Sequence, residues 1–204
     1  MSPFLLIAVS SYLVGSIPFG YLLVRIFRGE DVRQSGSGNI GATNVARKSP
    51  ALGVLTLLLD ALKGSAPVML TAHLSAQAAH GKVLMALAAL CAILGHMFPV
   101  WLKFRGGKGV ASGLGSFVVI APKAVVVAVC IFVIFWIVFR YVSLGSIVSV
   151  LAFPLLAWFL RECGGSWLAL GFMALASLLI VMKHRENIRR LLAGTENRFG
   201  SRRT

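Results

Sequence analysis

Three polar segments of the sequence contain residue types that could bind an anion and act on it. Each combines cationic side chains with glycine, serine, asparagine or histidine. Backbone amides that glycine allows to turn inward stabilise negative charge together with such cations. The segments therefore predict one shared site for an anionic reactant, with three unrelated connecting loops as the alternative. They read RQSGSGNIGATNVAR (33–47), GHMFPVWLKFRGGKGVAS (95–112) and KHRENIRRLLAGTENRFG (183–200).

The first segment contains the glycine pattern of a dinucleotide-binding turn, Gly36-x-Gly38-x-x-Gly41. That turn needs a preceding strand and an acidic residue about 20 positions later. Here an apolar stretch, not a strand, precedes the glycines. The next acidic residue, Asp60, lies inside a second apolar stretch. We therefore interpret the segment as an amide cradle for an anion, with a flexible Gly/Ser turn as the alternative. Its candidate binding and catalytic residues are Ser35, Gly36, Ser37, Gly38, Asn39, Gly41, Thr43, Asn44 and Arg47.

In the second segment, glycines surround a lysine in the run FRGGKG. The run is not a nucleotide-binding P-loop, because the upstream glycine and the Ser or Thr after the lysine are missing. Its amides can still bind phosphate at the start of the next helix, where the helix dipole is positive. The histidine at the expected membrane boundary is either a structural hydrogen-bond donor or part of the site. The candidate residues are His96, Arg105, Gly106, Gly107, Lys108 and Gly109.

The third segment has the pattern of a short helix at a membrane surface. His184 and Asn187 are three positions apart, so they share one face of that helix. An amphipathic tail alone does not account for this pair, which we interpret as part of the site. The helix also has an apolar stripe of Ile188, Leu191 and Leu192. Arg189 and Arg190 are expected to face water, and Gly194 is expected to end the helix.

Composition places these segments in a membrane protein. The chain has 204 residues, of which 58% are hydrophobic and 13% charged, and its mean hydropathy is +0.87. A soluble domain has about 25% charged residues. We therefore expect a single integral membrane domain over residues 1–204, an all-α bundle of about seven transmembrane helices. The apolar stretches are 3–27, 51–73, 82–102, 109–121, 123–141, 143–160 and 166–182.

The fourth stretch, 109–121, is too short for an ordinary span. As a helix it reaches only about 20 Å, whereas the apolar core of a bilayer is roughly 30 Å thick. It is therefore expected to be tilted, surrounded by thinned bilayer, or re-entrant.

The basic residues indicate how the bundle is oriented. If all seven stretches cross, most of the 20 Lys and Arg residues fall on the side of the three polar segments, and only Lys82, Lys123 and Arg161 fall on the other. Basic residues favour the cytoplasmic side of a membrane. We therefore expect the N-terminus outside, the C-terminus in the cytoplasm and the shared site on the cytoplasmic face.

The remaining charged residues limit the chemistry. Asp60 and Lys63 are three positions apart within the second stretch, where they form either a structural ion pair or a support for the site. The chain has only six acidic residues, without the clusters that hold Mg²⁺ or Zn²⁺, and no histidine is followed by Asp five positions later as in the His-x4-Asp acyltransferases. No metal or cofactor is therefore expected, and the site suits reactants that carry their own phosphate and activation.

The three segments resemble, in the same order, the motifs of the bacterial acyl-phosphate:glycerol-3-phosphate acyltransferases, the PlsY family, through SGSGNIGATNVAR, GHMFPVWLKFRGGKGVAS and KHRENIRRLLAGTENR. The resemblance covers essentially the whole chain. It implies transfer of a fatty acyl group from acyl phosphate to the sn-1 hydroxyl of glycerol 3-phosphate, giving lysophosphatidic acid and phosphate for phospholipid synthesis at the bacterial inner membrane. It also implies that Ser37, Arg47, His184 and Asn187 serve activity and that the Lys108 loop binds phosphate.

The chemistry of that reaction agrees with the residues present. An acyl phosphate is a mixed anhydride, so its phosphate leaves without help from a nucleotide or a metal. Cations and amides neutralise the charge on the departing phosphate. Without a Ser-His-Asp arrangement, direct attack by the glycerol hydroxyl is favoured over an acyl-enzyme, and the proton acceptor is either His184 or a phosphate oxygen of the substrate.

The expected partners are the two substrates, membrane lipids and the enzyme that makes acyl phosphate, and no nucleic acid. Two other classes of protein compete with this interpretation: a secondary transporter for phosphorylated metabolites and a lipid-binding scaffold without chemistry. The polar segments cluster on one face rather than at the midplane, and the sequence has no repeated halves, which argues against a transporter.

Overall fold

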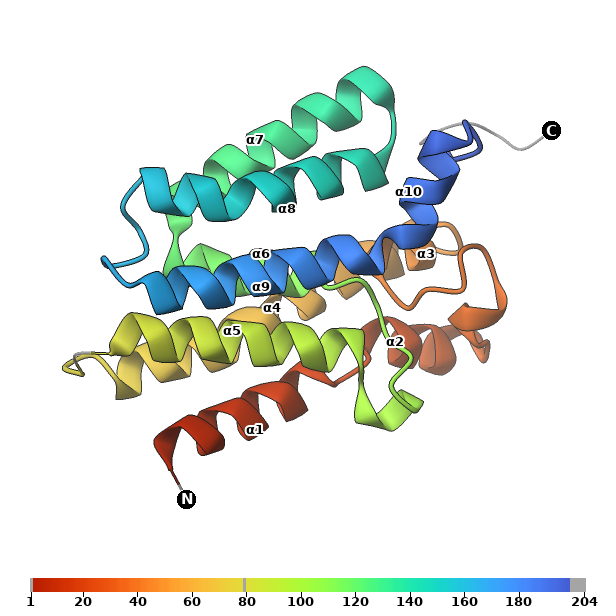
Figure 1. Cartoon of the computed structure of the whole chain (residues 1–204). Helices are drawn as coiled ribbons and strands as arrows, with labels where there is room; N and C mark the ends of the chain where they lie inside the picture. Colours follow the sequence, from red (N-terminus) through yellow and green to blue (C-terminus); the bar gives the residue numbers. More distant parts are fainter. Residues whose placement is uncertain (1, 79, 199–204) are drawn as a thin grey trace.

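The computed structural model describes residues 2–78 and 80–198, and the regular elements in these ranges are all helical (Figure 1). The long helices lie along one common direction, as expected for an all-α membrane bundle. The α-helices are α1 (Pro3–Gly15), α2 (Phe19–Arg28), α3 (Ala42–Ala46), α4 (Pro50–Leu74), α5 (Gly81–Met97), α6 (Val110–Ile120), α7 (Pro122–Phe139), α8 (Val142–Phe159), α9 (Trp167–Lys183) and α10 (Arg185–Leu192); the 3-10 turns are η1 (Val32–Gln34) and η2 (Val100–Leu102).

Every apolar stretch expected from the sequence forms helix, but the stretches differ in length. α6 has 11 residues, or about 16 Å, so the expectation of a short fourth stretch is confirmed. α9 and α10 together would form one more span, but they are bent by 55°. Among the described residues, five segments are long and apolar enough to cross a bilayer: Phe4–Arg28, Pro50–Leu74, Gly81–Leu102, Pro122–Phe139 and Val142–Phe159.

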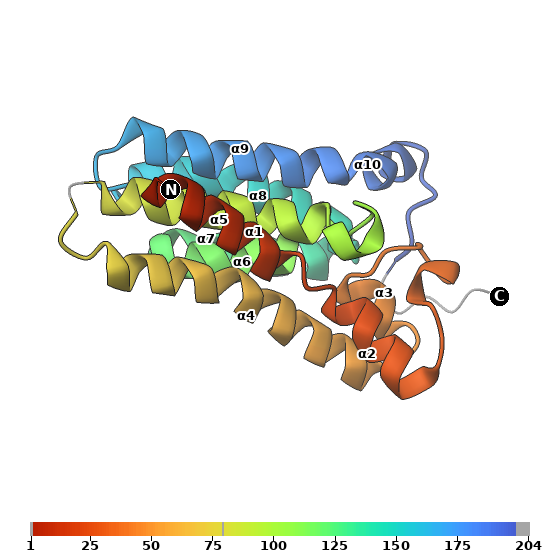
Figure 2. The same ribbon diagram turned by 90° about the horizontal axis from the view of Figure 1, so that it is seen from below.

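The first stretch, expected as one helix over 3–27, is broken in two (Figure 2). α1 ends at Gly15 and α2 begins at Phe19, directly after Pro18. Proline has no amide hydrogen for the helix ladder, and its ring clashes with the preceding turn. The expectation of a continuous helix was therefore wrong at this point. Gly15 also packs closely on α5, because a methyl group there would lie 2.1 Å from the carbonyl oxygen of Ala92.

Small residues hold α6 against α4. A methyl group on Gly64 would lie 2.2 Å from the carbonyl oxygen of Ser112, and one on Gly115 would lie 1.9 Å from that of Ala61. The Ser112 hydroxyl donates to the carbonyl oxygen of Asp60 over 3.1 Å. Helices in membranes associate through such small residues and interhelical hydrogen bonds. This contact fixes the start of α6, which follows the second polar segment directly.

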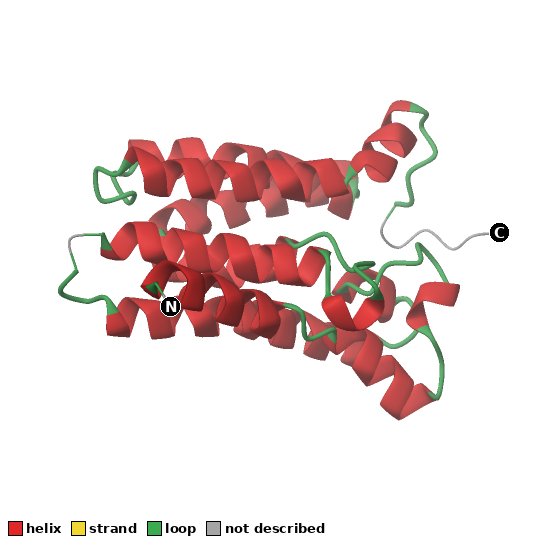
Figure 3. Cartoon of the chain, turned by 60° about the horizontal axis from the view of Figure 1, so that its bottom comes forward, coloured by secondary structure: helices red, strands yellow, loops and turns green. Residues whose placement is uncertain are grey.

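The three polar segments lie at the same end of the bundle. α2, α3 and α10 are found together at that end, and the N-terminus lies at the opposite end (Figure 2). Loops and short helical elements connect the long helices there (Figure 3). One of them is longer than expected, because α5 ends at Met97 before Pro99 and not at residue 102. The three segments therefore share one end of the bundle, as expected from the sequence.

Candidate active site

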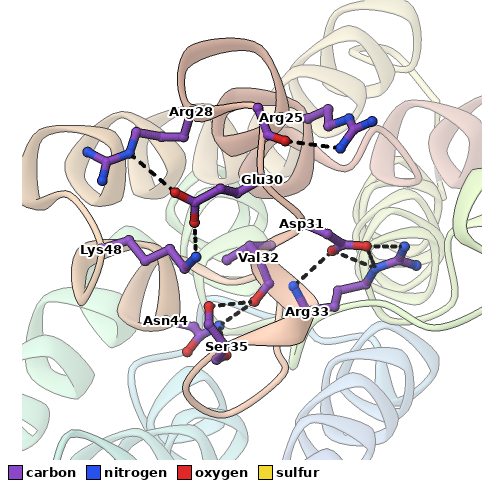
Figure 4. Close-up of polar contacts among 10 residues, drawn as sticks. Arg25, Arg28, Glu30, Asp31, Val32, Arg33, Ser35, Asn44 and Lys48 are labelled. Carbon is purple, nitrogen blue, oxygen red and sulfur yellow. Dashed lines mark hydrogen bonds and ion pairs between the residues drawn. The ribbon is translucent and has the colours of Figure 1, made fainter.

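Asn44 organises the first polar segment. It lies in α3 and is 3% exposed. Its Nδ2 lies 3.1 Å from the carbonyl oxygens of Val32 and Ser35 (Figure 4). Its Oδ1 accepts from the amide of Ser37 over 2.9 Å, and its Nδ2 also lies 2.9 Å from the carbonyl oxygen of Asn39. Asn44 was expected to be a donor to a ligand, but its amide is committed to the loop. Its observed role is to hold the loop backbone in shape.

Two glycines of this loop need their backbone freedom. Gly36 and Gly38 have φ of 61° and 68°, values that side chains other than glycine rarely adopt. A methyl group on Gly36 would lie 2.2 Å from Asn44 Oδ1 and 3.4 Å from Arg47 Nη1. The Arg47 guanidinium therefore lies against the loop, and the side chains of Arg47 and Ser37 are exposed.

Ion pairs anchor the two ends of the first segment (Figure 4). Lys48 pairs with Glu30, and Arg33 pairs with Asp31, with 2.6 Å between Nη2 and Oδ2. The hydrogen bonds from Arg33 lower the pKa of the Asp31 carboxyl group. Because both cations are paired, Arg47 is the cation of this segment best placed to meet an anion.

Lys108 joins the second segment to the third. Its Nζ donates to Oδ1 of Asn187 over 2.6 Å. The next residue, Gly109, has a φ of 91° and caps α6. A methyl group there would lie 3.1 Å from Ile93 of α5 and 3.3 Å from Ile180 of α9. The loop is therefore recessed between these helices, below the ends of α5 and α9.

Glu196 gathers the third segment around Asn187. Its Oε1 accepts from Nδ2 of Asn187 over 2.7 Å and from the Ser143 hydroxyl over 2.8 Å, and its Oε2 accepts from Nε of Arg190 over 2.7 Å. Arg190 was expected to face water, and its side chain is 34% exposed, but its guanidinium is paired with Glu196. Sequence reasoning missed Ser143, Arg190 and Glu196 as members of this cluster. The one available signal was an acid placed just after Gly194 in a strongly basic segment.

His184 lies between α9 and α10 and is 2% exposed. Its Nδ1 is 2.8 Å from the carbonyl oxygen of Ile180. Since a carbonyl oxygen only accepts, Nδ1 carries the hydrogen and Nε2 is left as an acceptor. Burial and the nearby charge of Lys108 lower the pKa of His184 to about 4. At neutral pH the site therefore contains a neutral imidazole that can accept a hydrogen at Nε2.

Burial also lowers the pKa of Lys108 to about 8. The charge of Glu196 raises it, whereas those of Arg190 and Arg47 lower it further. Arg47 thus lies close enough to Lys108 for their charges to interact, which brings all three polar segments into one electrostatic unit. Such a cationic site is completed by an anionic ligand, because a phosphate would reduce the repulsion between its cations.

The other expected site residues have different locations. His96 is 3% exposed, and its imidazole lies against Gly107 of the second loop. Arg105 is exposed and, with Arg33 and Lys183, lines a cavity of about 580 Å³ between the first and second segments. Gly38 and Gly106 contribute to the same cavity, whereas Thr43 is an exposed residue of α3. Ser35, Asn39 and Gly41 form hydrogen bonds within the first loop.

Metal chemistry was not expected from the sequence. In residues 2–78 and 80–198, no three His, Cys, Asp or Glu side chains gather as metal ligands. The described side chains of the site include a lysine, arginines, a glutamate, an asparagine, a serine and a neutral histidine.

A helical membrane bundle with this cluster at one end has the architecture of a membrane enzyme for an anionic substrate. A sequence model of the family described as glycerol-3-phosphate acyltransferase matches residues 5–194. Proteins named glycerol-3-phosphate acyltransferase are 44% identical over 200 residues in Syntrophotalea carbinolica (98% of this chain, 99% of the relative) and 46% identical over 193 residues in Ehrlichia canis (95% and 97%).

A solved structure gives the same result. The crystal structure of PlsY (YgiH), an integral membrane glycerol 3-phosphate acyltransferase, in its glycerol 3-phosphate form has a TM-score of 0.88 and 37% identity, covering 98% of this chain and 96% of that one. Its lysophosphatidic acid form has a TM-score of 0.85. The chain belongs to the glycerol-3-phosphate acyltransferase family, as an integral membrane protein of the PlsY type.

Proposed function

We propose that the protein transfers a fatty acyl group from acyl phosphate to the sn-1 hydroxyl of glycerol 3-phosphate. The observation that supports this most directly is the cluster in which Lys108, bonded to Asn187, lies within electrostatic reach of Arg47 and beside the neutral His184. The cluster offers charge for a phosphate and an acceptor for a hydroxyl hydrogen in one place. Lysophosphatidic acid and inorganic phosphate are the products.

In the proposed reaction, the glycerol oxygen attacks the acyl carbonyl carbon. The bond between that carbon and the phosphate oxygen breaks, and the phosphate leaves with the electron pair. Lys108 and Arg47 stabilise the charge that grows on the leaving phosphate. Holding both reactants in one orientation also lowers the barrier. The reaction needs no acyl-enzyme, because the attacking hydroxyl and the leaving group belong to the substrates.

The hydroxyl proton goes to Nε2 of His184 in this proposal. The Nδ1 contact with Ile180 fixes the ring and its tautomer, as a positioned general base requires. A phosphate oxygen of the bound substrate is the alternative acceptor. Ser37 and the amides of the two glycine loops are proposed as further phosphate ligands, and the cavity between Arg33, Arg105 and Lys183 as the entrance for glycerol 3-phosphate.

The donor is tested with the purified protein. Palmitoyl phosphate and glycerol 3-phosphate should give lysophosphatidic acid without added nucleotide, and activity should survive EDTA, because the proposed groups are all side chains and amides of this chain. Palmitoyl-CoA or palmitoyl-acyl carrier protein in place of palmitoyl phosphate should give no product. A strict requirement for Mg²⁺ or for a thioester donor would contradict the proposal.

The lowered pKa of Lys108 predicts a pH dependence. Lys108 is a cation below about pH 8 and neutral above it, so anion binding should weaken as the pH rises through this value. kcat/KM for glycerol 3-phosphate, which reports the free enzyme, should therefore fall above about pH 8. Lys108→Arg should move this fall to higher pH, because arginine keeps its charge. Lys123→Arg is the control, and an unchanged profile in Lys108→Arg would exclude Lys108 as the group responsible.

We further propose that the chain lies in the bacterial cytoplasmic membrane with its site in the cytoplasm. Cysteines introduced at Thr43, Lys103 and Arg189 should be labelled only after the cells are opened, whereas one at Lys123 should react with an impermeant maleimide in intact cells. All four positions are exposed, and the background should lack the three native cysteines. Labelling of Lys123 only in opened cells would show that α6 does not cross.

A further inference from the structure

Two charged residues are buried inside the bundle, away from the reacting groups. Asp60 is 1% exposed and Lys63 3% exposed, and both lie in α4. Lys63 Nζ is 2.7 Å from Asp60 Oδ1, so the two residues form an ion pair, and the sequence left open whether this pair is only structural or supports the site. Charged residues inside a membrane are costly and usually serve function. The proposed mechanism assigns no step to this pair, so its contacts must indicate its role.

Lys63 contacts the break in the first apolar stretch. Its Nζ donates to the carbonyl oxygen of Ile17 over 2.6 Å. Ile17 lies between α1 and α2, where Pro18 interrupts the helix ladder and leaves carbonyl groups without helical partners. α2 leads directly into the first glycine loop. The buried ammonium therefore holds the helix that carries one half of the site.

Asp60 faces the other half of the site through His96. Nδ1 of His96 is 3.6 Å from Asp60 Oδ1, and neither atom has a hydrogen-bond partner among the described residues. The carboxylate therefore acts on the ring through its charge, which favours the tautomer with its hydrogen on Nδ1. On the other side of the ring lies the second glycine loop. Gly107 donates its amide hydrogen to the His96 carbonyl over 3.0 Å, and a methyl group on Gly107 would lie 2.0 Å from Nε2 of His96.

We propose that Asp60, Lys63 and His96 form a buried positioning cluster that sets the backbone of residues 105–109 and the entry to the first glycine loop. The imidazole of His96 is the surface on which Gly107 rests, and Lys108 follows it in the chain. The three residues do not touch substrate in this arrangement. They act through the two loops, so this inference rests on the proposed role of Lys108 in binding phosphate.

A double-mutant cycle tests the contact between His96 and Gly107. Gly107→Ala places a methyl group against the ring, whereas His96→Ala removes the ring. Gly106→Ala is the matched control, because its methyl group would meet the His96 carbonyl oxygen at 2.2 Å and Pro99 Cδ at 2.3 Å. Those atoms remain when the His96 side chain is truncated. Each single variant and both double variants are compared by KM for glycerol 3-phosphate, kcat and melting temperature.

Gly107→Ala should lower kcat/KM for glycerol 3-phosphate about 10- to 100-fold, since a misplacement of about 1 Å has effects of this size on the rate. Adding His96→Ala should recover at least about fivefold of that loss. Adding His96→Ala to Gly106→Ala should recover none of the activity that Gly106→Ala loses. If Gly107→Ala does not yield folded protein, the proposal expects that adding His96→Ala restores folding. Adding His96→Ala to Gly106→Ala should not restore folding. Losses that multiply independently would overturn the proposal.

A separate set of variants tests the ion pair between Asp60 and Lys63. Asp60→Asn should destabilise the protein, because Lys63 is left as an unpaired buried charge. Adding Lys63→Met should restore the melting temperature, but kcat/KM should stay lowered, because Ile17 and His96 have both lost their contacts. A double variant with normal kcat and KM would show that the pair has only a structural role and would remove it from the proposal.

Different results would contradict the proposed function and the proposed positioning cluster. If the unmodified protein does not use acyl phosphate and glycerol 3-phosphate, the proposed function fails. The pattern of melting temperatures in the His96 and Gly107 cycle would still test the packing. If the unmodified protein is active but the cycle has no coupling, the positioning cluster fails alone.

Discussion

Replacing His184 with asparagine or glutamine is expected to lower kcat by about 10²- to 10⁴-fold, the usual range for loss of a general base. The two changes remove different halves of the ring. Asparagine keeps a donor near the position of Nδ1, which faces Ile180, and loses the acceptor at Nε2. Glutamine places a polar atom near the position of Nε2 but cannot take a proton at neutral pH. Both should be nearly as inactive as alanine, with little change in the affinity for glycerol 3-phosphate.

The glutamine variant decides between the two proton acceptors. If His184 only holds the substrate in place, His184→Gln should retain near-normal kcat and raise KM. That outcome would exclude the histidine base and favour a phosphate oxygen of the substrate. Binding of glycerol 3-phosphate to the purified variant checks that the site is still formed. His73→Gln, at an exposed position of α4, is the matched control and should behave like the unmodified protein.

Lys108→Ala is expected to lower kcat/KM about 10- to 160-fold. A hydrogen bond to a charged group contributes about 1.5–3 kcal/mol, and each 1.36 kcal/mol corresponds to a tenfold change. The contact of Lys108 with Asn187 should be lost as well. If the lysine serves the leaving phosphate, kcat should carry the loss, whereas a contact to bound glycerol 3-phosphate should appear in KM.

Two controls interpret this result. Lys123→Ala removes an exposed lysine from the start of α7 and should have no effect. Lys108→Met keeps the length of the side chain without its charge, and it should be as damaging as alanine. Normal activity in Lys108→Met would mean that the lysine contributes packing rather than charge, which would contradict its proposed role.

Much of the fold could be predicted because membrane spans depend on local apolar composition. The stretches 51–73, 123–141, 143–160 and 166–182 agree with their helices to within two residues at each end. The break at Pro18 was missed, because the flanking residues remain apolar and hydropathy is insensitive to backbone geometry. The early end of α5 at Met97 was missed for the same reason, although Pro99 was a visible signal.

The site could be predicted only in part. Residue types placed Lys108, His184 and Asn187 correctly at one end of the bundle, because charge and spacing are local properties. The roles of Asn44 and His96 could not be deduced from type, since an amide or imidazole serves equally well to bind a ligand or to hold a loop. Glu196 depends on hydrogen bonds to Ser143, 53 positions away, and no local pattern indicates such a contact.

The recessed position of the second loop determines from which phase each reactant reaches the site. Gly109 lies level with Ile93 and Ile180, about one helical turn or roughly 5 Å inside the ends of α5 and α9. In the proposed reaction, glycerol 3-phosphate enters through the cavity lined by Arg33, Arg105 and Lys183, whereas the fatty acyl donor would arrive by diffusing sideways within the leaflet. For the second reactant, the relevant quantity is its mole fraction among the surrounding lipids. Adding more bilayer therefore dilutes it, even when the volume of the solution stays the same.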